Sequence, residues 1–324
     1  MRIHVHDPRI GLPRRLTPEI WAACFAGEDP CWAGLEVTFG ETNEALAAML
    51  PDVETLVCTQ PPPRPFHAAP RLRRIFCTFS GMDALMPLDW LPPGVTLLNN
   101  SGVHGAKAGE YAIMSMLMLA NNVPAYAADQ GRQLWQRRPG GMLRGRRLTV
   151  IGLGALGGGA AKWAKQFGMH VTGVRMRPGP HPDCDRVCAT GRLEEVLPES
   201  EFLLLACPLN DGTRNILNRT RIGLLPLGGY LINIGRGDLL DQEGLCDALD
   251  SGGLGGAVLD VFAQEPVGPG HRIWTTPNLL MTPHVSCDDA GSYLAQCLEV
   301  LKTNLIALAA GQALPNQVDP RLGY

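Results

Sequence analysis

The residues of this chain best suited to acid–base chemistry are three ionisable side chains, each of which follows an apolar run in the sequence. They are Arg236 in LINIGRGDLL, Glu265 in LDVFAQEP and His284 in LLMTPHVS. An arginine can bind a carboxylate bidentately and polarise the adjacent carbonyl, and a histidine can give or take the proton that accompanies hydride transfer. A glutamate hydrogen-bonded to that histidine favours the imidazolium and orients the ring. Each residue alone is compatible with a structural role, so the prediction depends on all three converging.

A glycine-rich turn earlier in the chain predicts a dinucleotide site. The segment LTVIGLGALGGGAA, from Leu148 to Ala161, has the pattern of a strand, a tight turn and a small-residue helix. The first glycine allows the turn, the second lets backbone approach a pyrophosphate, and the third lets the helix pack on the strand. A glycine-rich turn of another α/β protein is the alternative. The residues predicted to bind the pyrophosphate are Gly152, Gly154, Ala155, Leu156 and Gly157.

The next predicted strand, 170–174, ends where a dinucleotide fold contacts the adenosine ribose. An acidic residue at that point would bind a free 2′-hydroxyl, but Arg175 and Arg177 stand there instead. A guanidinium offers several donors to a 2′-phosphate and can stack on adenine, so NADP(H) is favoured and NAD(H) is the second option. The alternative is that both arginines are solvated residues of a loop rich in Pro and Gly.

Composition favours a metabolic enzyme with small-molecule partners. The 324 residues include 28 Lys+Arg and 31 Asp+Glu, a net charge of −3 that predicts no binding of nucleic acid or anionic membranes. Ten cysteines without a CxxC pair predict reduced thiols in a cytoplasm, with neither a disulfide framework nor a metal site. The N-terminus lacks the apolar core of a signal peptide, and no apolar run reaches membrane-spanning length.

Short apolar segments alternate with helix-like ones, a pattern that predicts α/β architecture with two doubly wound parallel sheets in tandem. Ligands bind at the carboxyl ends of parallel strands, so the polar residues that follow the strands are expected to converge. An apolar helix at 107–120 has the composition of a helix between domains or subunits. The first unit is predicted to have strands at 3–5, 35–39, 55–58, 75–78 and 96–99 and helices at 18–26 and 43–49; the second has strands near 148, 171, 203, 230, 257 and 280.

The segments GLGALG, LINIGRG, LDVFAQEP and TPHVS, in this order and spacing, resemble the D-isomer-specific 2-hydroxyacid dehydrogenase family. The resemblance covers nearly the whole chain and implies two Rossmann-like domains with a cleft between them. It implies catalytic roles for Arg236, Glu265 and His284. The cofactor-binding residues implied in the same way are Cys207, Pro208, Ile234, Gly235 and Asp260, the last against the nicotinamide carboxamide. The segment FSGMDAL resembles the family loop whose backbone N–H groups bind the substrate carboxylate, which implies Ser80, Gly81 and Met82.

Finer similarities indicate one branch of the family. The segments VRMR and GAKAGEYAIM, the prolines 61 and 62, and the ending QVDPRLGY resemble NADPH-using bacterial glyoxylate/hydroxypyruvate reductases. That branch has an aromatic residue before the prolines, whereas this chain has Thr59 and Gln60, so the size and polarity of the substrate pocket stay open. The family fold implies a substrate domain of residues 1–100 plus 289–324 and a dinucleotide-binding domain of residues 101–288. The helix at 107–120 would then lie in a homodimer interface.

We therefore expect an oxidoreductase that reduces a small 2-oxo acid, such as glyoxylate or hydroxypyruvate, to the D-2-hydroxy acid with NADPH. Arg236 and the backbone of residues 80–82 would bind the carboxylate, and His284 would protonate the forming alkoxide. One alternative is a related dehydrogenase of another small acid; by resemblance, Glu265 suits a phosphite enzyme better than a formate enzyme. Another is a nucleotide-sensing protein that resembles the family's corepressors.

Overall fold

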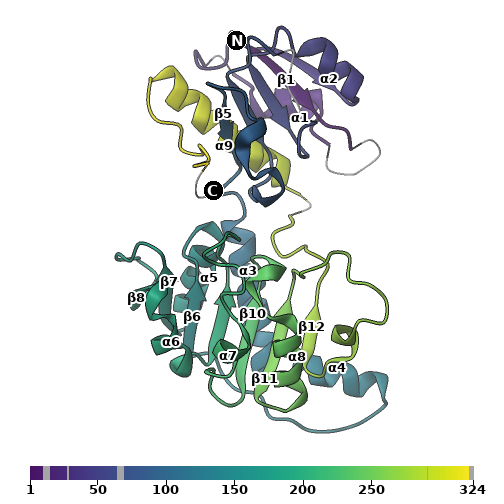
Figure 1. The fold of residues 1–324 in the computed structure, drawn as a ribbon, viewed down its shortest axis with the longest axis vertical. Coiled ribbons are helices and arrows are strands. Elements are labelled where there is room, and N and C mark those ends of the chain that lie inside the picture. The colour runs from purple at the N-terminus through teal and green to yellow at the C-terminus, as the bar shows by residue number, and fades with distance from the viewer. Residues whose placement is uncertain (10–14, 28, 64–68, 290, 321–324) are drawn as a thin grey trace. The chain divides into compact units, whose positions relative to one another are not determined.

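The structure, a computed structural model of the chain, describes all residues except 10–14, 28, 64–68, 290 and 321–324. The chain forms two compact units, one of Met1–Val103 with Asp289–Tyr324 and one of His104–Asp288. Each unit is a parallel sheet with helices packed on both of its faces (Figure 1), which confirms the predicted α/β class. The C-terminal segment returns to the first unit, so that unit is built from both ends of the chain.

The first unit contains a five-stranded, all-parallel sheet in the order β2-β1-β3-β4-β5. The order reverses between β1 and β3, and in open sheets of this kind ligands bind at that switch point, beyond the carboxyl ends of the strands. His6 lies in register with Gly40 and Cys58, and Cys58 with Cys77, so four strands end level with one another. The strands are β1 (Arg2–His6), β2 (Glu36–Gly40), β3 (Thr55–Cys58), β4 (Arg74–Cys77) and β5 (Thr96–Leu98).

Alternating side chains of these strands fill two separate cores, because successive residues of a strand point to opposite faces of the sheet. Val57 packs in one core with Trp21 and Leu298, whereas its neighbour Leu56 packs in the other core with Leu46. The first core lies beneath two helices and the second beneath one, as their buried residues show. These helices are α1 (Pro18–Cys24) and α9 (Tyr293–Ala309) on the first face and α2 (Asn43–Met49) on the second.

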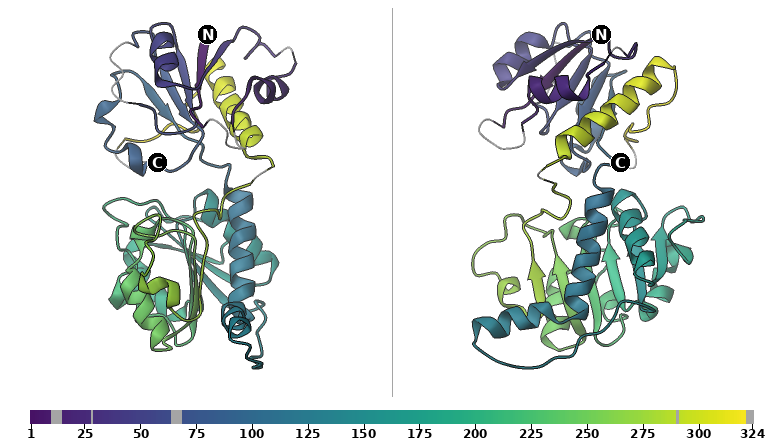
Figure 2. Two further views of the ribbon diagram at one scale, coloured as in Figure 1. Left: turned by 90° about the vertical axis from the view of Figure 1, so that its right-hand side faces the viewer. Right: turned by 180° about the vertical axis from the view of Figure 1, so that it is seen from behind.

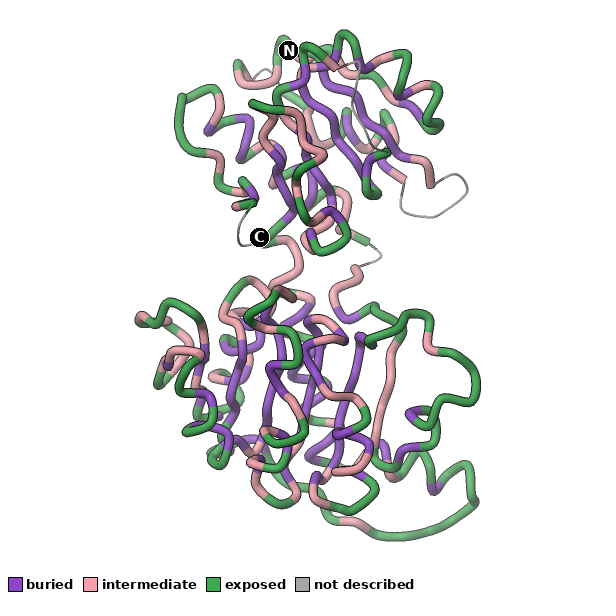
Figure 3. Tube along the Cα trace, in the orientation of Figure 1, coloured by how far each residue is buried: buried purple, intermediate pink, exposed green. Residues whose placement is uncertain are grey.

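The second unit contains a seven-stranded, all-parallel sheet in the order β12-β11-β10-β9-β6-β7-β8. Its central strands are buried on both faces, which explains why they are near-continuous apolar runs in the sequence (Figure 3). The strands are β6 (Arg147–Ile151), β7 (His170–Arg175), β8 (Arg186–Ala189), β9 (Phe202–Leu205), β10 (Gly229–Asn233), β11 (Leu254–Leu259) and β12 (Leu279–Met281). Only β8 was not predicted. It is a four-residue edge strand whose apolar residues are small and mostly not buried, so the sequence carries little signal for it.

Two helices lie close together on one face of this sheet because glycines line their crossing. A Cβ on Gly159 would lie 2.0 Å from the carbonyl oxygen of Gly105, and one on Gly109 would lie 2.5 Å from the Trp163 ring. The crossing therefore requires residues without side chains. These helices are α3 (Gly105–Ala120), which Figure 2 shows along the sheet, and α5 (Ala155–Gln166). The opposite face is covered by α6 (Leu193–Val196), α7 (Arg219–Ile222) and α8 (Gln242–Asp250).

A further helix, α4 (Val123–Gly131), follows α3. Short 3₁₀ turns lie at Asp83–Leu85, Leu88–Trp90, Thr190–Arg192, Leu197–Glu199, Gly237–Leu239 and Arg272–Thr275. Within the described residues, no helix has both the length and the apolar character needed to cross a bilayer.

Candidate active site

The predicted pyrophosphate turn joins β6 to α5 and has the shape that a dinucleotide needs. Gly152 has a φ of 94°, and a Cβ there would lie 2.6 Å from the Cα of Cys207. A Cβ on Gly157 would lie 1.8 Å from the Gly152 carbonyl oxygen, so the helix can start this close to the strand only without a side chain.

Gly154 differs from these two glycines because nothing lies within 4 Å of its Cβ direction. It is the N-cap of α5, and no side chain caps the first N–H groups of that helix. Uncapped amide groups at a helix N-terminus, beside open space, form a site for a phosphate anion. The residues present therefore fit the pyrophosphate of a dinucleotide.

Arg175, the last residue of β7, and Arg177, which follows the strand, are in different environments. Arg175 folds back on its own loop, and its Nη2 donates to the carbonyl oxygens of Gly179 at 2.7 Å and Pro180 at 3.3 Å. Its Nε is buried without a hydrogen-bond partner in the described chain. Arg177 is exposed and has no ion pair or hydrogen bond with any described residue. Arg175 thus shapes the loop, whereas the donors of Arg177 are unpaired within the described residues.

Arg236 is held at the end of β10 by the buried amide of Asn233. The Asn233 Nδ2 donates to the Arg236 carbonyl oxygen at 2.9 Å, and its Oδ1 accepts from the Gly235 N–H at 3.1 Å. A Cβ on Gly237 would lie 1.9 Å from the carbonyl carbon of Phe262, so the loop behind β10 lies directly against the loop behind β11. This contact brings the Arg236 loop beside the loop that carries Glu265.

Glu265 and His284 form a hydrogen-bonded pair, with 2.8 Å between Oε2 and Nδ1. The other carboxylate oxygen accepts from the Phe262 N–H at 2.8 Å, which fixes the glutamate. An ionised carboxylate only accepts, so Nδ1 carries the proton and donates it, and Nε2 is left as the atom for proton exchange. The His284 side chain is half exposed, which leaves room for a substrate at Nε2.

A buried carboxylate fixes the backbone around His284. Asp260, fully buried at the end of β11, accepts from the Thr282 hydroxyl at 2.6 Å, the Val285 N–H at 2.8 Å and the Ser286 N–H at 2.9 Å. Its own carbonyl oxygen accepts from the His284 N–H at 2.8 Å, which supports a left-handed backbone with a φ of 56°. These contacts give Asp260 a loop-organising role that the sequence did not predict.

The remaining cofactor positions predicted from the resemblance lie at the ends of neighbouring strands. Cys207 follows β9, is buried, and has its thiol pKa raised by burial to about 12, so it is a neutral thiol. Ile234 and Gly235 follow β10, and a Cβ on Gly235 would lie 3.1 Å from the Cys207 carbonyl oxygen. Pro208, the next residue after Cys207, is exposed. The four residues thus line the edge of the sheet beside the glycine turn.

The predicted substrate loop follows β4 in the first unit. Ser80 donates its hydroxyl to the Asn100 carbonyl oxygen at 2.9 Å, and Met82 is buried in the core. The N–H groups of Ser80, Gly81 and Met82 donate to no acceptor among the residues that the structure describes. Three successive unsatisfied amide donors at the carboxyl edge of a sheet are suited to binding an anion.

A comparison with protein families matches residues 113–286 to the family described as "D-isomer specific 2-hydroxyacid dehydrogenase, NAD binding domain". The chain belongs to the D-isomer specific 2-hydroxyacid dehydrogenase family. A relative from Streptomyces coelicolor, described as "Uncharacterized protein in mprR 3'region", is 31% identical over 279 residues, which are 85% of this chain and 97% of that protein. Glyoxylate/hydroxypyruvate reductase A of Salmonella paratyphi B is 28% identical over 270 residues, 81% of this chain and 85% of that enzyme.

Solved structures of family members share the fold of this dehydrogenase over its whole length. A D-isomer specific 2-hydroxyacid dehydrogenase from Xanthobacter autotrophicus, in complex with NADPH and MES, has a TM-score of 0.85 and 27% identity and covers 99% of both chains. An NADPH-dependent glyoxylate/hydroxypyruvate reductase from Sinorhizobium meliloti, in complex with NADP and sulfate, has a TM-score of 0.83 and 27% identity over 100% of both chains. The protein is thus an NAD(P)-dependent oxidoreductase of small 2-hydroxy and 2-oxo acids.

Several positioning residues of this dehydrogenase were not predicted from its sequence. Asn233 sets the Arg236 turn, and the Tyr111 hydroxyl lies 2.5 Å from the hydroxyl of Thr282, which in turn donates to Asp260. The only signal for Asn233 was a polar residue at the end of an otherwise apolar strand. Within the described residues, no group of three His, Cys, Asp or Glu side chains could hold a metal ion.

Proposed function

We propose that this dehydrogenase is an NADPH-dependent reductase of small 2-oxo acids such as glyoxylate and hydroxypyruvate, with the D-2-hydroxy acid as product. The observation that carries the proposal is the Glu265–His284 pair, whose protonated Nδ1 leaves Nε2 available beside the Arg236 loop. The relatives from Salmonella and Sinorhizobium that are named as glyoxylate/hydroxypyruvate reductases support the substrate class.

In this reaction each of the three side chains has one role. Arg236 binds the substrate carboxylate through its guanidinium and stabilises charge that develops on the neighbouring oxygen. Glu265 orients His284 and stabilises its cationic form, and His284 transfers the Nε2 proton to the oxygen of C2. The reduced nicotinamide supplies the hydride when it is bound. The amide donors of Ser80, Gly81 and Met82 are proposed as a second contact for the same carboxylate.

The preference for NADP over NAD is proposed from the loop behind β7. The described chain places no carboxylate at the strand end, where Arg175 braces the loop carbonyls and Arg177 is exposed without a partner. An unpaired guanidinium can take a 2′-phosphate through charge-assisted hydrogen bonds. We propose that Asp260, Cys207, Pro208, Ile234 and Gly235 line the bound nicotinamide half of the cofactor.

We propose a homodimer that covers the exposed apolar side chains of the second unit. Met114 and Leu117 are exposed on the same face of α3, since residues three apart are neighbours on a helix. After α4, Trp135 is 95% exposed and Met142 is 77% exposed. Apolar side chains this accessible are typical of a protein–protein interface, and a second copy of the chain is the partner that the family resemblance implies.

A cytoplasmic location is proposed as well. All ten cysteines are free, and six of them are buried. Free thiols at this number persist in a reducing compartment.

Steady-state NADPH oxidation with glyoxylate, hydroxypyruvate, pyruvate, longer 2-oxo acids and phosphite tests the proposal, with NADH as the comparison cofactor. We expect turnover of a small 2-oxo acid and a decrease of about 10²-fold or more in the His284→Ala variant. His271→Ala is the matched control, because His271 is an exposed histidine of the same unit. Its Nδ1 accepts from the Ile273 N–H at 3.2 Å, and its Nε2 lies 3.8 Å from a Glu243 oxygen. Parent turnover by the His284→Ala variant would refute the proposed acid. Nucleotide binding without turnover would favour a sensor.

A further inference from the structure

The first unit carries a buried arginine that the reaction described above does not use. Arg9 follows β1, and its side chain is only 14% exposed. Its Nε and Nη2 form a bidentate pair with the two oxygens of Asp7, at 2.9 and 3.0 Å. Such a fork uses one edge of the guanidinium and leaves the Nη1 edge open. The Nη1 group donates to no acceptor among the described residues.

Both oxygens of the Asp7 carboxylate accept hydrogen bonds from several donors. Besides Arg9, it accepts from the Leu16 N–H at 2.8 Å and from the Thr59 hydroxyl at 2.8 Å. These donors lower the Asp7 pKa to about 2 against the opposing effect of burial, so the carboxylate is ionised at neutral pH. Asp7 therefore fixes the plane of the Arg9 guanidinium. The N–H groups of Arg9 Nη1 are left to donate to a ligand.

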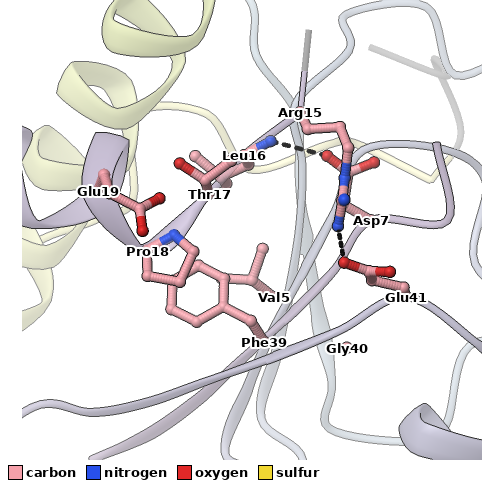
Figure 4. A pocket seen from close by; sticks show the side chains of 10 residues that line it. All are labelled: Val5, Asp7, Arg15, Leu16, Thr17, Pro18, Glu19, Phe39, Gly40 and Glu41. Carbon is pink, nitrogen blue, oxygen red and sulfur yellow. Dashed lines mark hydrogen bonds and ion pairs between the residues drawn. The ribbon is translucent and has the colours of Figure 1, made fainter. Parts of the chain in front are cut away.

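The position of Arg9 in the fold is that of a ligand-binding residue. Asp7 and Arg9 follow β1 and Thr59 follows β3, and these are the two strands between which the order of the sheet reverses. In open parallel sheets, ligands bind at this switch point. Asp7 also lines a cavity of about 230 Å³ together with the Arg15–Glu41 pair and Glu19 (Figure 4). Three carboxylates line that cavity and disfavour an anion there, whereas the Nη1 edge of Arg9 faces no carboxylate partner among the described residues.

The positive charge of Arg9 also acts on two side chains of α9, Tyr293 and Cys297. The Tyr293 hydroxyl donates to the carbonyl oxygen of Thr78, two residues before Ser80. Burial raises the pKa of Tyr293, and the positive charge of Arg9 opposes that rise. The same charge opposes the burial that raises the Cys297 pKa. Arg9 therefore lies near two α9 side chains that contact the Thr78 carbonyl oxygen, at the start of the loop whose amide groups are proposed to bind the substrate carboxylate.

We infer that Arg9 binds a second anionic group on the substrate, so that the enzyme reduces 2-oxo acids carrying a distal carboxylate or phosphate ester. This inference rests on the proposed function and narrows its substrate class. The strands that carry the two donor groups, β1 and β4, are two strand spacings apart, or about 10 Å. The Arg9 side chain spans part of that distance, so the acid bridging the two donor groups is short. Thr59 stands where the resembling branch has an aromatic residue, and its buried hydroxyl donates to Asp7.

The test compares substrates that differ only in the second anionic group. The pairs are oxaloacetate with 2-oxobutanoate, 2-oxoglutarate with 2-oxopentanoate, and phosphohydroxypyruvate with hydroxypyruvate. For each pair, the ratio of the two kcat/KM values is measured on one enzyme preparation, so the fraction of folded protein cancels. The two carboxylate pairs and the phosphate pair distinguish the two sources of the distal charge.

We expect the wild type to favour the dianionic member of at least one pair. The Arg9→Gln variant should lower that ratio by about 10- to 100-fold, the usual effect of losing a charge-assisted contact. Arg9→Lys keeps the charge, removes the fork and should give an intermediate ratio; it also serves if the glutamine variant does not fold. Arg71→Gln is the matched control, because Arg71 is an exposed arginine of the same unit paired with Asp52. Its ratios should equal those of the wild type.

Ratios that are the same in the wild type and both Arg9 variants would overturn the inference while the proposed function stands. If the wild type reduces no 2-oxo acid, the proposed function fails, and binding then decides the inference separately. In that case, the thermal stabilisation of the NADP-loaded protein by D-malate is compared with that by D-2-hydroxybutanoate. Selective stabilisation by malate that disappears in Arg9→Gln supports the role of Arg9, and equal stabilisation by both acids refutes it.

Discussion

Replacing Asp260 with asparagine tests whether the buried carboxylate holds the His284 loop. The amide oxygen can still accept from the Thr282 hydroxyl and the Val285 N–H, but the new NH2 group faces the Ser286 N–H, which now lies 2.9 Å from Oδ2. Two buried donors are left unsatisfied at about 1–3 kcal/mol each, and two charge-assisted bonds become neutral. We expect a loss of about 3–5 kcal/mol in the free energy of unfolding of the second unit.

Thermal and urea unfolding measure this loss, which corresponds to a decrease of about 10 °C in Tm for a unit of this size. Asp241→Asn is the matched control. Asp241 is the N-cap of α8, where its Oδ1 accepts from the Gly244 N–H, and asparagine caps a helix about as well as aspartate. In Asp260→Asn, kcat should also decrease by about 10²-fold, because the backbone of the proposed acid shifts. An unfolding midpoint equal to that of Asp241→Asn would refute the reasoning about the carboxylate.

Three further predictions concern pH, cofactor binding and assembly. Burial lowers the pKa of His4 to about 4, so the unfolded chain binds the proton more readily and the free energy of unfolding falls as pH drops below about 6.5. At pH 5 the free energy of unfolding should be about 2 kcal/mol lower than at pH 7.5. In urea titrations at both pH values, the His4→Gln variant should lose correspondingly less stability between them. Gly157→Ala places a Cβ 1.8 Å from the Gly152 carbonyl oxygen, so NADP should no longer raise the Tm, whereas Gly191→Ala, with open space around its Cβ, should bind normally. Trp135→Ala should shift the mass measured by light scattering from dimer toward monomer, and an unchanged mass at low concentration would exclude Trp135 from the interface.

The fold could be predicted from local patterns because a buried parallel strand is an apolar run that needs no distant partner to be recognised. β9, with the sequence FLLL, is fully buried and was found in this way, and so was β10, which ends before Arg236. β12, before His284, was found because Leu279–Met281 are all apolar, although this edge strand is only partly buried. The edge strand β8 was missed because its apolar residues, Val, Cys and Ala, are small and only one of its four residues is buried. The glycine turn was readable for the same reason as the strands, since the spacing of Gly152, Gly154 and Gly157 is a local property.

The supporting contacts of the site could not be predicted because they join residues far apart in the sequence. The Tyr111 hydroxyl meets that of Thr282 across 171 positions, and Thr59 meets Asp7 across 52. A buried aspartate at the end of β11 and one at the end of β1 look alike in the sequence. One organises the His284 loop through three donors, and the other fixes an arginine fork. What separates the two roles is the set of donors that the fold brings to each carboxylate, so polar residues at strand ends acquire their function from their neighbours in space.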